Sequence, residues 1–366
     1  MQQNKTIALL IPSLGGGGAE KVFVNLSNFF LQKGYNVWML TSKEGSCFTL
    51  LNQNVNVFQI HRFRNIILNY LLGIFQASFF LVKYKPHFLL CTLVESNLIG
   101  TFAKKISFSR TILILRQAYI ITDSTNSERK AIKFLKKTFN YCDGIIANSP
   151  DTSISLQKYC GIAERKIKTI PNPVYNSHAI SLSQKDIDVL SKDFILAVGN
   201  LKKEKDYNTL IEAFSYVRNQ TNIDLLILGE GPLKTELIEL AKSLKVQEHI
   251  IFYGFCSNPY PFFAKAKLFV LSSEYEGFGN VIVEALSVGT PIVSTNCLGG
   301  PSYILENGKY GTLVPVRNPK LLADAIIREL NKKSPSKDFL INRAKEFSIE
   351  AIGEKYLHYI EQLSKD

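Results

Sequence analysis

The residues best placed to do chemistry are two glutamates, Glu276 and Glu284, which stand on either side of a glycine-rich turn. The apolar run 267–271 predicts a buried strand and 281–288 predicts a helix, so Glu276 lies in the connecting loop and Glu284 one turn into the helix. Gly277 and Gly279 allow the backbone to approach a ligand, and the free N–H groups of a helix start favour an anion such as phosphate. Both carboxylates are therefore expected to face one ligand pocket.

The same two carboxylates narrow the chemistry of that ligand. They would repel a bare phosphate, whereas a carboxylate is a good bidentate acceptor for paired hydroxyl groups. The pattern therefore predicts a ligand that carries both phosphates and sugar hydroxyls.

A second glycine-rich turn follows the apolar run 6–11 near the start of the chain. Gly15, Gly16, Gly17 and Gly18 precede an amphipathic helix, and their backbone N–H groups can surround an oxyanion. The dinucleotide pattern G-x-G-x-x-G is missing here, and no acidic residue closes the second strand at Thr41. A merely flexible turn is the alternative interpretation.

The elements that position these turns form a repeating pattern. Apolar strand-like runs at 6–11, 36–41, 55–60, 87–92, 111–115 and 144–148 alternate with helical segments, and the pattern restarts at 194–198, 224–228, 250–253, 268–271 and 291–294. Such alternation predicts parallel sheets covered by helices, an α/β fold with ligands at the carboxyl ends of the strands. The proline-containing segment 170–174 predicts a linker, giving domains at 1–172 and 173–349 and a last helix, 350–366, that packs back on the first domain.

The formal charge of +12 predicts an anionic partner: nucleic acid, a membrane surface or a phosphorylated substrate. No zinc-finger spacing, aromatic RNA-binding run or long basic tail accompanies it, so a membrane is favoured. Segment 66–82 is interpreted as a buried helix, with a helix that dips into lipid headgroups as the alternative. Four cations without an interleaved acid predict a face for anionic lipid or a diphosphate, and a solvated helix face is the alternative; they are Arg129, Lys133, Lys136 and Lys137.

The cysteines and the amino-terminal residues indicate the cellular compartment of the protein. Six scattered cysteines lack C-x-x-C pairs, which favours reduced thiols and argues against a metal site. The chain runs directly from Met1 into a strand, without the order of a signal peptide. We expect a cytoplasmic protein.

Four segments share their order and spacing with a known family. They are GGAEKVFVNLS, ILAVGNLKKEKDYNTLIEAF, LLILGEGPLKTEL and EGFGNVIVEALSVGTPIVST, the last beginning at Glu276. In these segments the chain resembles the retaining glycosyltransferases of the GT-B fold, of the family 4 type with an E-x7-E motif, as in bacterial surface-polysaccharide synthesis. The resemblance implies two Rossmann-like, doubly wound domains that face each other across a cleft and bind a nucleotide sugar.

The resemblance also implies roles for residues that match the family pattern. Glu284 would bind the ribose hydroxyls, Glu276 would lie beside the transferred sugar, and Lys205 would contact the diphosphate. Asn200 stands where the family usually has arginine, which removes a fixed charge from the donor site. The remaining implied donor contacts are Gly17, Gly18, Cys256, Gly277, Phe278, Gly279 and Asn280.

The group that activates the acceptor stays unassigned. Arg116 ends the run 111–115 about where many members carry a histidine, so it is a candidate to orient phosphate or acceptor. The only D-x-D motif, Asp186-Ile187-Asp188, lies in the polar linker, so no metal and no cofactor is expected.

The resemblance implies a hexosyltransferase that moves a hexose or N-acetylhexosamine from a UDP-sugar to a polyprenyl-diphosphate-linked glycan, for surface polysaccharide or glycoprotein assembly. The basic charge then predicts a peripheral protein on the inner face of the cell membrane. A nucleotide-sugar epimerase of the same fold and a nonenzymatic membrane-associated binding protein are the alternatives. The residues by themselves predict only two α/β domains that bind a phosphorylated, hydroxyl-rich ligand.

Overall fold

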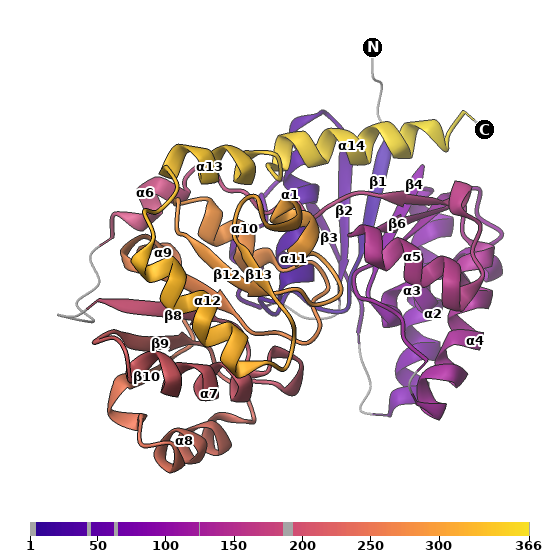
Figure 1. The fold of residues 1–366 in the computed structure, drawn as a ribbon. Coiled ribbons are helices and arrows are strands. Elements are labelled where there is room, and N and C mark those ends of the chain that lie inside the picture. Colours follow the sequence, from indigo (N-terminus) through magenta and orange to yellow (C-terminus); the bar gives the residue numbers. More distant parts are fainter. Residues whose placement is uncertain (1–4, 42–44, 62–64, 124, 186–192, 366) are drawn as a thin grey trace. The chain divides into compact units, whose positions relative to one another are not determined.

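The chain folds into two compact units, each built around its own parallel sheet (Figure 1). The computed structural model describes residues 5–41, 45–61, 65–123, 125–185 and 193–365. Unit 1 comprises 1–173 and 349–366, and unit 2 comprises 174–348. The predicted boundaries at 172/173 and 349/350 each lie one residue from these.

The strands of both units follow the apolar runs of the sequence. Unit 1 contains β1 (Thr6–Leu10), β2 (Asn36–Thr41), β3 (Asn56–Gln59), β4 (Phe88–Thr92), β5 (Ile112–Gln117), β6 (Gly144–Ala147) and β7 (Ile167–Thr169). Unit 2 contains β8 (Phe194–Val198), β9 (Asp224–Leu228), β10 (Ile250–Gly254), β11 (Leu268–Leu271), β12 (Ile292–Thr295) and β13 (Thr312–Val314). Sequence reasoning missed β7 and β13, which are three residues long and lie at sheet edges.

The two sheets have one topology. Their strand orders are β3-β2-β1-β4-β5-β6-β7 and β10-β9-β8-β11-β12-β13, and every pairing between these strands is parallel. The order reverses between β1 and β4 in unit 1 and between β8 and β11 in unit 2. This is the doubly wound arrangement, so the predicted α/β class is confirmed.

Helices cover both faces of each sheet because the central strands are apolar on both sides. In unit 1 they are α1 (Gly18–Gln32), α2 (Ile66–Tyr84), α3 (Val94–Ser107), α4 (Asn126–Tyr141), α5 (Pro150–Cys160) and α14 (Ile349–Gln362). In unit 2 they are α6 (Ala179–Ser183), α7 (Tyr207–Arg218), α8 (Lys234–Ser243), α9 (Tyr260–Lys265), α10 (Asn280–Leu286), α11 (Pro301–Ile304), α12 (Pro319–Asn331) and α13 (Lys337–Lys345). Short 3-10 turns lie at Phe48–Leu50, Glu164–Lys166, Lys203–Lys205, Gln247–His249 and Glu306–Gly308.

The last helix, α14, belongs to unit 1 and packs against α1, which lies more than 300 residues earlier in the chain (Figure 1). Its residues Ile352, Tyr356 and Ile360 are buried in the same apolar cluster as Phe29 and Phe30 of α1. The Tyr35 hydroxyl donates to a Glu361 carboxylate oxygen at 2.7 Å, which adds a polar tether. The core of unit 1 is therefore completed by the end of the chain.

The α2 helix differs from the buried helix that was expected. Ala77, Phe80 and Leu81 are buried, but several apolar side chains on the other face are more than half exposed. By length and composition 67–84 could cross a membrane, yet this helix also packs closely on α3. The expectation of a buried helix is therefore wrong for one of its faces.

Candidate active site

The loops after β8 and β11 form the candidate site in unit 2. These two strands are neighbours at the point where the strand order reverses. Loops at the carboxyl ends of two such strands diverge to opposite faces of the sheet and leave a crevice for a ligand. The loop after β8 carries Lys205, and the loop after β11 carries Glu276.

Lys205 and Glu276 form an ion pair at this position. The Lys205 Nζ lies 2.6 Å from Glu276 Oε1, and that same oxygen accepts a hydrogen bond from Ser273 Oγ at 2.7 Å. The Glu276 side chain is 7% exposed and the Lys205 side chain 22% exposed, so the pair is largely shielded from solvent. Two of the residues predicted to contact the donor thus meet in one place.

Two further hydrogen bonds hold the two loops together, and a third joins the second loop to β12. Ser272 Oγ donates to the Lys205 carbonyl oxygen at 2.9 Å, and the Glu274 backbone N–H donates to the Glu204 carbonyl oxygen at 2.9 Å. Thr295 Oγ1 donates to the Ser273 carbonyl oxygen at 2.6 Å, which ties the second loop to β12. The lysine and the glutamate are therefore positioned by the backbone as well as by their own charges.

A carboxylate and a guanidinium brace the outer side of the same loop. Arg317 Nε and Nη2 donate to the two Glu274 carboxylate oxygens at 2.5 and 2.7 Å, a bidentate geometry. The hydrogen bond from Arg317 is the main reason that the pKa of Glu274 is lowered. Sequence reasoning missed Arg317, and its separation of 43 residues from Glu274 left no local signal.

Two glycines allow this loop to pack against the turn 298–300. A Cβ on Gly299 would lie 2.1 Å from the Glu276 carbonyl oxygen, and one on Gly300 would lie 1.7 Å from that of Phe278. Any side chain at either position would push the Glu276 loop away from β12. The backbone turns at Gly279, whose φ of +92° lies in the left-handed region, and α10 begins there.

The remaining predicted donor residues of unit 2 follow the carboxyl ends of β8, β10 and β11, and they differ in burial. Glu284 is half-buried on α10, and its negative charge adds to the effect of burial in raising the pKa of Tyr260. Gly277, Asn280 and Cys256 are also half-buried, Asn200 is exposed, and Phe278 is buried with its ring 5.7 Å from that of Phe347. Phe278 therefore supports the loop from inside and offers no side-chain surface to a ligand.

Gly17 and Gly18 occupy the corresponding position in unit 1. They follow β1, are exposed, and begin α1, with Gly17 as its N-cap. Sequence reasoning missed the neighbouring loop after β4. There Leu93 has a φ of +69°, a strained value for a branched residue, and Ser96 Oγ and Asn97 Oδ1 are buried without a hydrogen-bond partner in the described part of the chain.

Arg116 does not line a ligand site. It is 1% exposed, and its guanidinium donates to Tyr356 Oη at 3.1 Å, Thr92 Oγ1 at 2.9 Å and Asn172 Oδ1 at 2.5 Å. These bonds join β4, β5, α14 and the segment after β7 that contains Asn172. The prediction that Arg116 orients phosphate or acceptor is corrected here, since the side chain is an internal cross-link.

The four predicted basic residues of α4 are all exposed: Arg129, Lys133, Lys136 and Lys137. At 3.6 residues per turn they share one face of the helix. Among the residues that the structure describes, no group of three histidine, cysteine or acidic side chains could hold a metal ion. The D-x-D motif at 186–188 lies outside the described residues.

Two family models together match most of the chain. The model described as "Glycosyltransferase Family 4" matches 16–177, and the one described as "Glycosyl transferases group 1" matches 183–347. The first spans most of unit 1 up to the start of unit 2, and the second lies within unit 2.

Curated relatives resemble the chain over nearly its whole length. One is the N-acetylgalactosamine-N,N'-diacetylbacillosaminyl-diphospho-undecaprenol 4-alpha-N-acetylgalactosaminyltransferase of Campylobacter jejuni, 28% identical over 97% of this chain and 99% of the relative. Another is the lipopolysaccharide core biosynthesis glycosyltransferase LpsE of Rhizobium meliloti, 26% identical over 94% of this chain and 96% of the relative.

Solved structures share the fold at low sequence identity. HepE of Anabaena in complex with UDP and glucose superposes with a TM-score of 0.81 at 20% identity, covering 98% of this chain and 100% of that chain. A glycosyltransferase of Rickettsia africae gives a TM-score of 0.81 at 17% identity, covering 100% of both chains. With two matching family models and this fold, the chain belongs to the family 4 glycosyltransferases of the GT-B fold.

Proposed function

We propose that this glycosyltransferase moves a hexose or N-acetylhexosamine from a UDP-sugar to a polyprenyl-diphosphate-linked glycan, with retention of configuration and without a metal ion. The observation that carries the proposal is the Lys205–Glu276 pair, 2.6 Å apart at the reversal point of a parallel sheet. The Campylobacter relative supports it by a name that states an undecaprenol-diphosphate-linked acceptor. The UDP and glucose bound by HepE support the choice of donor.

Lys205 is assigned to the leaving group. Cleavage of the bond between sugar and phosphate develops negative charge on the diphosphate, and a fixed cation stabilises that charge most in the transition state. An ammonium has three N–H donors, so Lys205 can bond Glu276 and a diphosphate oxygen at the same time. Glu276 then holds the lysine in place and lies beside the transferred sugar, while Glu284 accepts hydrogen bonds from the ribose.

The chemical step is a front-face displacement. The acceptor oxygen bonds to the anomeric carbon on the side from which the diphosphate departs, and the acceptor proton passes to an oxygen of the leaving diphosphate. No nucleophile from the protein is consumed. Cys297 does not supply one at neutral pH, because burial and, to a smaller extent, the Glu276 charge raise the pKa of its thiol to about 12.

The acceptor class and the charge of the chain together give the location. A polyprenyl-linked acceptor lies at an anionic membrane surface, and each nearby Lys or Arg gains about 1 kcal/mol there. We propose a peripheral protein on the cytoplasmic face of the cell membrane, with Arg129, Lys133, Lys136 and Lys137 near the lipid or the acceptor diphosphate.

The test is transfer from a panel of radiolabelled UDP-hexoses and UDP-N-acetylhexosamines to a polyprenyl-diphosphate-linked glycan, with mass spectrometry of the product. We expect an acceptor one sugar longer, with the new linkage α when the donor is α-linked. Free epimerised sugar nucleotide would instead identify an epimerase, and donor binding without turnover a binding protein.

A variant of one residue tests the pocket itself. Glu284→Ala removes a charged hydrogen bond to ribose, worth about 1.5–3 kcal/mol, so the donor KM should rise about 10- to 150-fold. An unchanged donor KM would remove this pocket from the proposal.

A further inference from the structure

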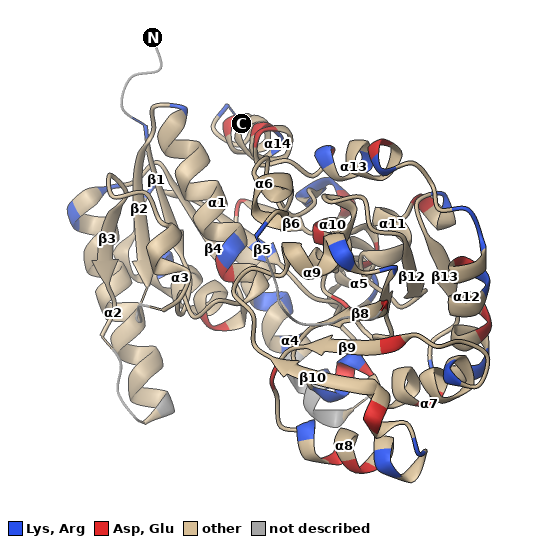
Figure 2. Cartoon of the chain, turned by 90° about the vertical axis from the view of Figure 1, so that its left-hand side faces the viewer, with Lys and Arg blue, Asp and Glu red and all other residues tan. Residues whose placement is uncertain are grey.

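The exposed face of α2 is an apolar stripe. Its exposed members are Ile67, Leu68, Leu71, Phe75, Phe79 and Val82, with Phe75 70% exposed. At about 100° per residue they fall within an arc of about 120°. No acidic residue occurs in the helix, which is uncharged up to its last turn (Figure 2). Such a contiguous exposed stripe marks an interaction surface, whereas single exposed apolar residues do not.

The apolar surface continues onto the next two helices. Phe102 and Ile106 of α3 are exposed, and the Phe102 ring lies 6.4 Å from that of Phe134 on α4. Helices α2 and α3 pack closely side by side. The stripe is therefore one edge of a wider apolar surface on unit 1.

A pocket of about 670 Å³ lies at one end of the stripe, at the edge of the sheet where its strands begin. Its apolar walls include Val82, Phe88 and Phe108. Three cationic side chains, Lys5, Lys85 and Arg110, also line it, and no acidic residue is among its lining residues. Val82 belongs to both the stripe and the pocket, so the two surfaces are continuous.

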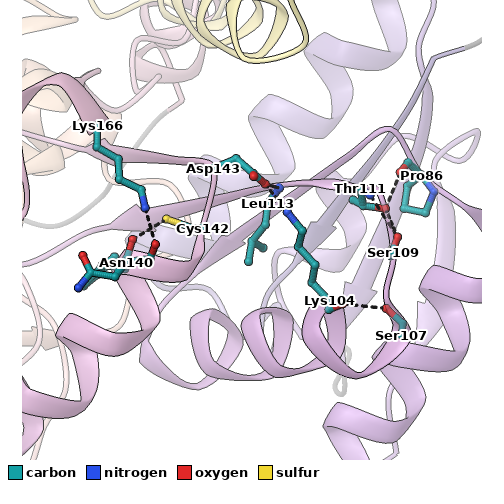
Figure 3. Close-up of polar contacts among 11 residues, drawn as sticks. Pro86, Lys104, Ser107, Ser109, Thr111, Leu113, Asn140, Cys142, Asp143 and Lys166 are labelled. Atoms are coloured by element: carbon teal, nitrogen blue, oxygen red, sulfur yellow. Dashed lines mark hydrogen bonds and ion pairs between the residues drawn. The ribbon is translucent and has the colours of Figure 1, made fainter. Parts of the chain in front are cut away.

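The walls of this pocket are fastened to each other. Thr111 Oγ1 donates to the Pro86 carbonyl oxygen at 2.7 Å and lies 2.7 Å from Ser109 Oγ, which joins the loop after α2 to the loop after α3 (Figure 3). The nearby Lys104 does not line the pocket, and it pairs with Asp143 at 2.5 Å (Figure 3). The pocket is thus a preformed feature of the fold.

The solvent exposure and the backbone conformation of Phe108 are both energetically unfavourable. Phe108 is 92% exposed, and its φ of +49° puts a bulky residue in the left-handed region. Exposure of a large apolar side chain and backbone strain both cost free energy in water. Insertion of the ring into an apolar medium would remove the first of these costs.

The charges decide which partner covers this surface. A second copy of the chain, packed symmetrically on the same face, would cover the apolar stripe but would offer Lys83, Lys85 and Arg110 no acidic partner from α2 or from the pocket lining, because neither contains an acidic residue. An anionic bilayer instead supplies acyl chains for the stripe and phosphates for the cations. We propose that the α2 stripe and the adjoining pocket dock on an anionic phospholipid bilayer, with a lipid phosphate held by Lys5, Lys85 and Arg110.

This inference rests on the proposed function only for the location of the acceptor at a membrane. The pocket lies at the start of the unit 1 strands, whereas Gly17 and Gly18, the predicted ligand contacts of unit 1, follow the carboxyl end of β1. The lipid held here is therefore a membrane anchor and is separate from the glycan acceptor.

The first experiment is co-sedimentation with vesicles of phosphatidylcholine, with and without phosphatidylglycerol. Wild type should bind the vesicles that contain phosphatidylglycerol. Neutralisation by Lys85→Gln with Arg110→Gln should weaken binding about 30-fold, from about 1 kcal/mol for each cation. Leu71→Asp with Phe75→Asp should abolish binding to the vesicles that contain phosphatidylglycerol.

Matched controls separate this surface from the overall charge. Lys320→Gln with Lys333→Gln removes the same charge from exposed sites in unit 2, and Tyr216→Asp with Leu321→Asp introduces the same two negative charges at exposed apolar residues there. These controls should change vesicle binding less than twofold. Equal effects of the control and the test variants would overturn the proposal, as would a wild-type dimer that the Leu71→Asp, Phe75→Asp change dissociates.

Two more measurements test where the lipid binds and whether the variants are folded. A photoactivatable phosphatidic acid in the vesicles should label peptides covering 79–88 and 106–112, and labelling confined to unit 2 would contradict the assignment. The α2 and pocket variants should transfer sugar to a short-chain acceptor in detergent at the wild-type rate. This result would show that the variants are folded. If wild type itself fails that assay, the proposed function fails while the vesicle result still decides the docking surface.

Discussion

At the scale of single residues, the Lys205–Glu276 pair predicts a separation of stability from activity. Lys205→Met leaves a nearly buried carboxylate without its cation, which should lower the free energy of unfolding by about 1–3 kcal/mol. Adding Glu276→Gln removes the isolated charge, so the double variant should recover most of that stability. Turnover should stay lost in both variants, because the leaving-group cation is absent in each. Thermal unfolding together with kcat provides the check, and recovery of kcat in the double variant would contradict the role of Lys205.

The hydrogen bonds of Arg116 predict that its replacement lowers stability and leaves donor binding nearly unchanged. Arg116→Met leaves the Thr92, Asn172 and Tyr356 side chains without their shared donor, and a buried polar group left unpaired costs about 1–3 kcal/mol. We expect a clear drop in the melting temperature of unit 1 and little change in donor KM for the protein that remains folded. A large loss of kcat at an unchanged melting temperature would restore Arg116 as a functional residue.

At the scale of structural elements, the Glu274–Arg317 brace predicts a pH dependence. The folded-state pKa of Glu274 is lowered from 4.5, so its stabilising contribution is complete above 4.5 and is lost as the pH falls through the lowered value. Arg317→Ala removes the cause of the shift. The variant should differ from wild type in melting temperature near neutral pH, and the two should converge in acid. A difference that stays constant down to acid pH would show that the brace acts through something other than this carboxylate.

The contact between α1 and α14 gives another prediction at this scale. A Cβ on Gly353 would lie 2.5 Å from Cδ1 of the Phe29 ring, which is a rigid neighbour in the core. Gly353→Ala should therefore destabilise unit 1 by about 1–3 kcal/mol, even though alanine is the better helix former. Denaturant unfolding measures this, with Lys355→Ala on the exposed face of the same helix as the control. Equal stability of the two variants would mean that α14 moves aside at little cost.

The same elements show how far sequence reasoning reached. Long apolar runs such as 268–271 identified strands correctly, whereas the edge strands Ile167–Thr169 and Thr312–Val314 are too short to show a period. The buried state of 66–82 was predicted from its overall apolarity, and the error arose because half of that apolar surface faces outward.

The candidate site was predictable in its residue types and less so in its contacts. The glycine-rich loop and its glutamates stand out locally, and the strand order places Lys205 near Glu276. The hydrogen bonds from Ser272 and Arg317 reach partners that are 67 and 43 residues away in the sequence, respectively. No local sequence pattern therefore predicts these two bonds. Arg116 was misjudged because the type of a residue at a strand end does not reveal whether its side chain points inward.

At the scale of the whole molecule, charge neutralisation of the donor is predicted to need no metal. The described residues offer Lys205 and backbone N–H groups at the glycine-rich turns, and they contain no group of three potential metal ligands. Excess EDTA should leave most of the transfer activity, measured with the UDP-sugar that the donor panel identifies. Complete loss of activity that manganese restores would overturn this prediction.

The split of unit 1 across the two ends of the chain has a consequence for biosynthesis. When the ribosome has made residue 348, every residue of unit 2 exists, but unit 1 still lacks α14 and the side chains of Ile352, Tyr356 and Ile360 that complete its core. The core of unit 1, the unit translated first, therefore cannot be completed before unit 2 has been translated. Until α14 has emerged from the ribosome, the unfinished apolar surface of unit 1 is open to chaperones and proteases.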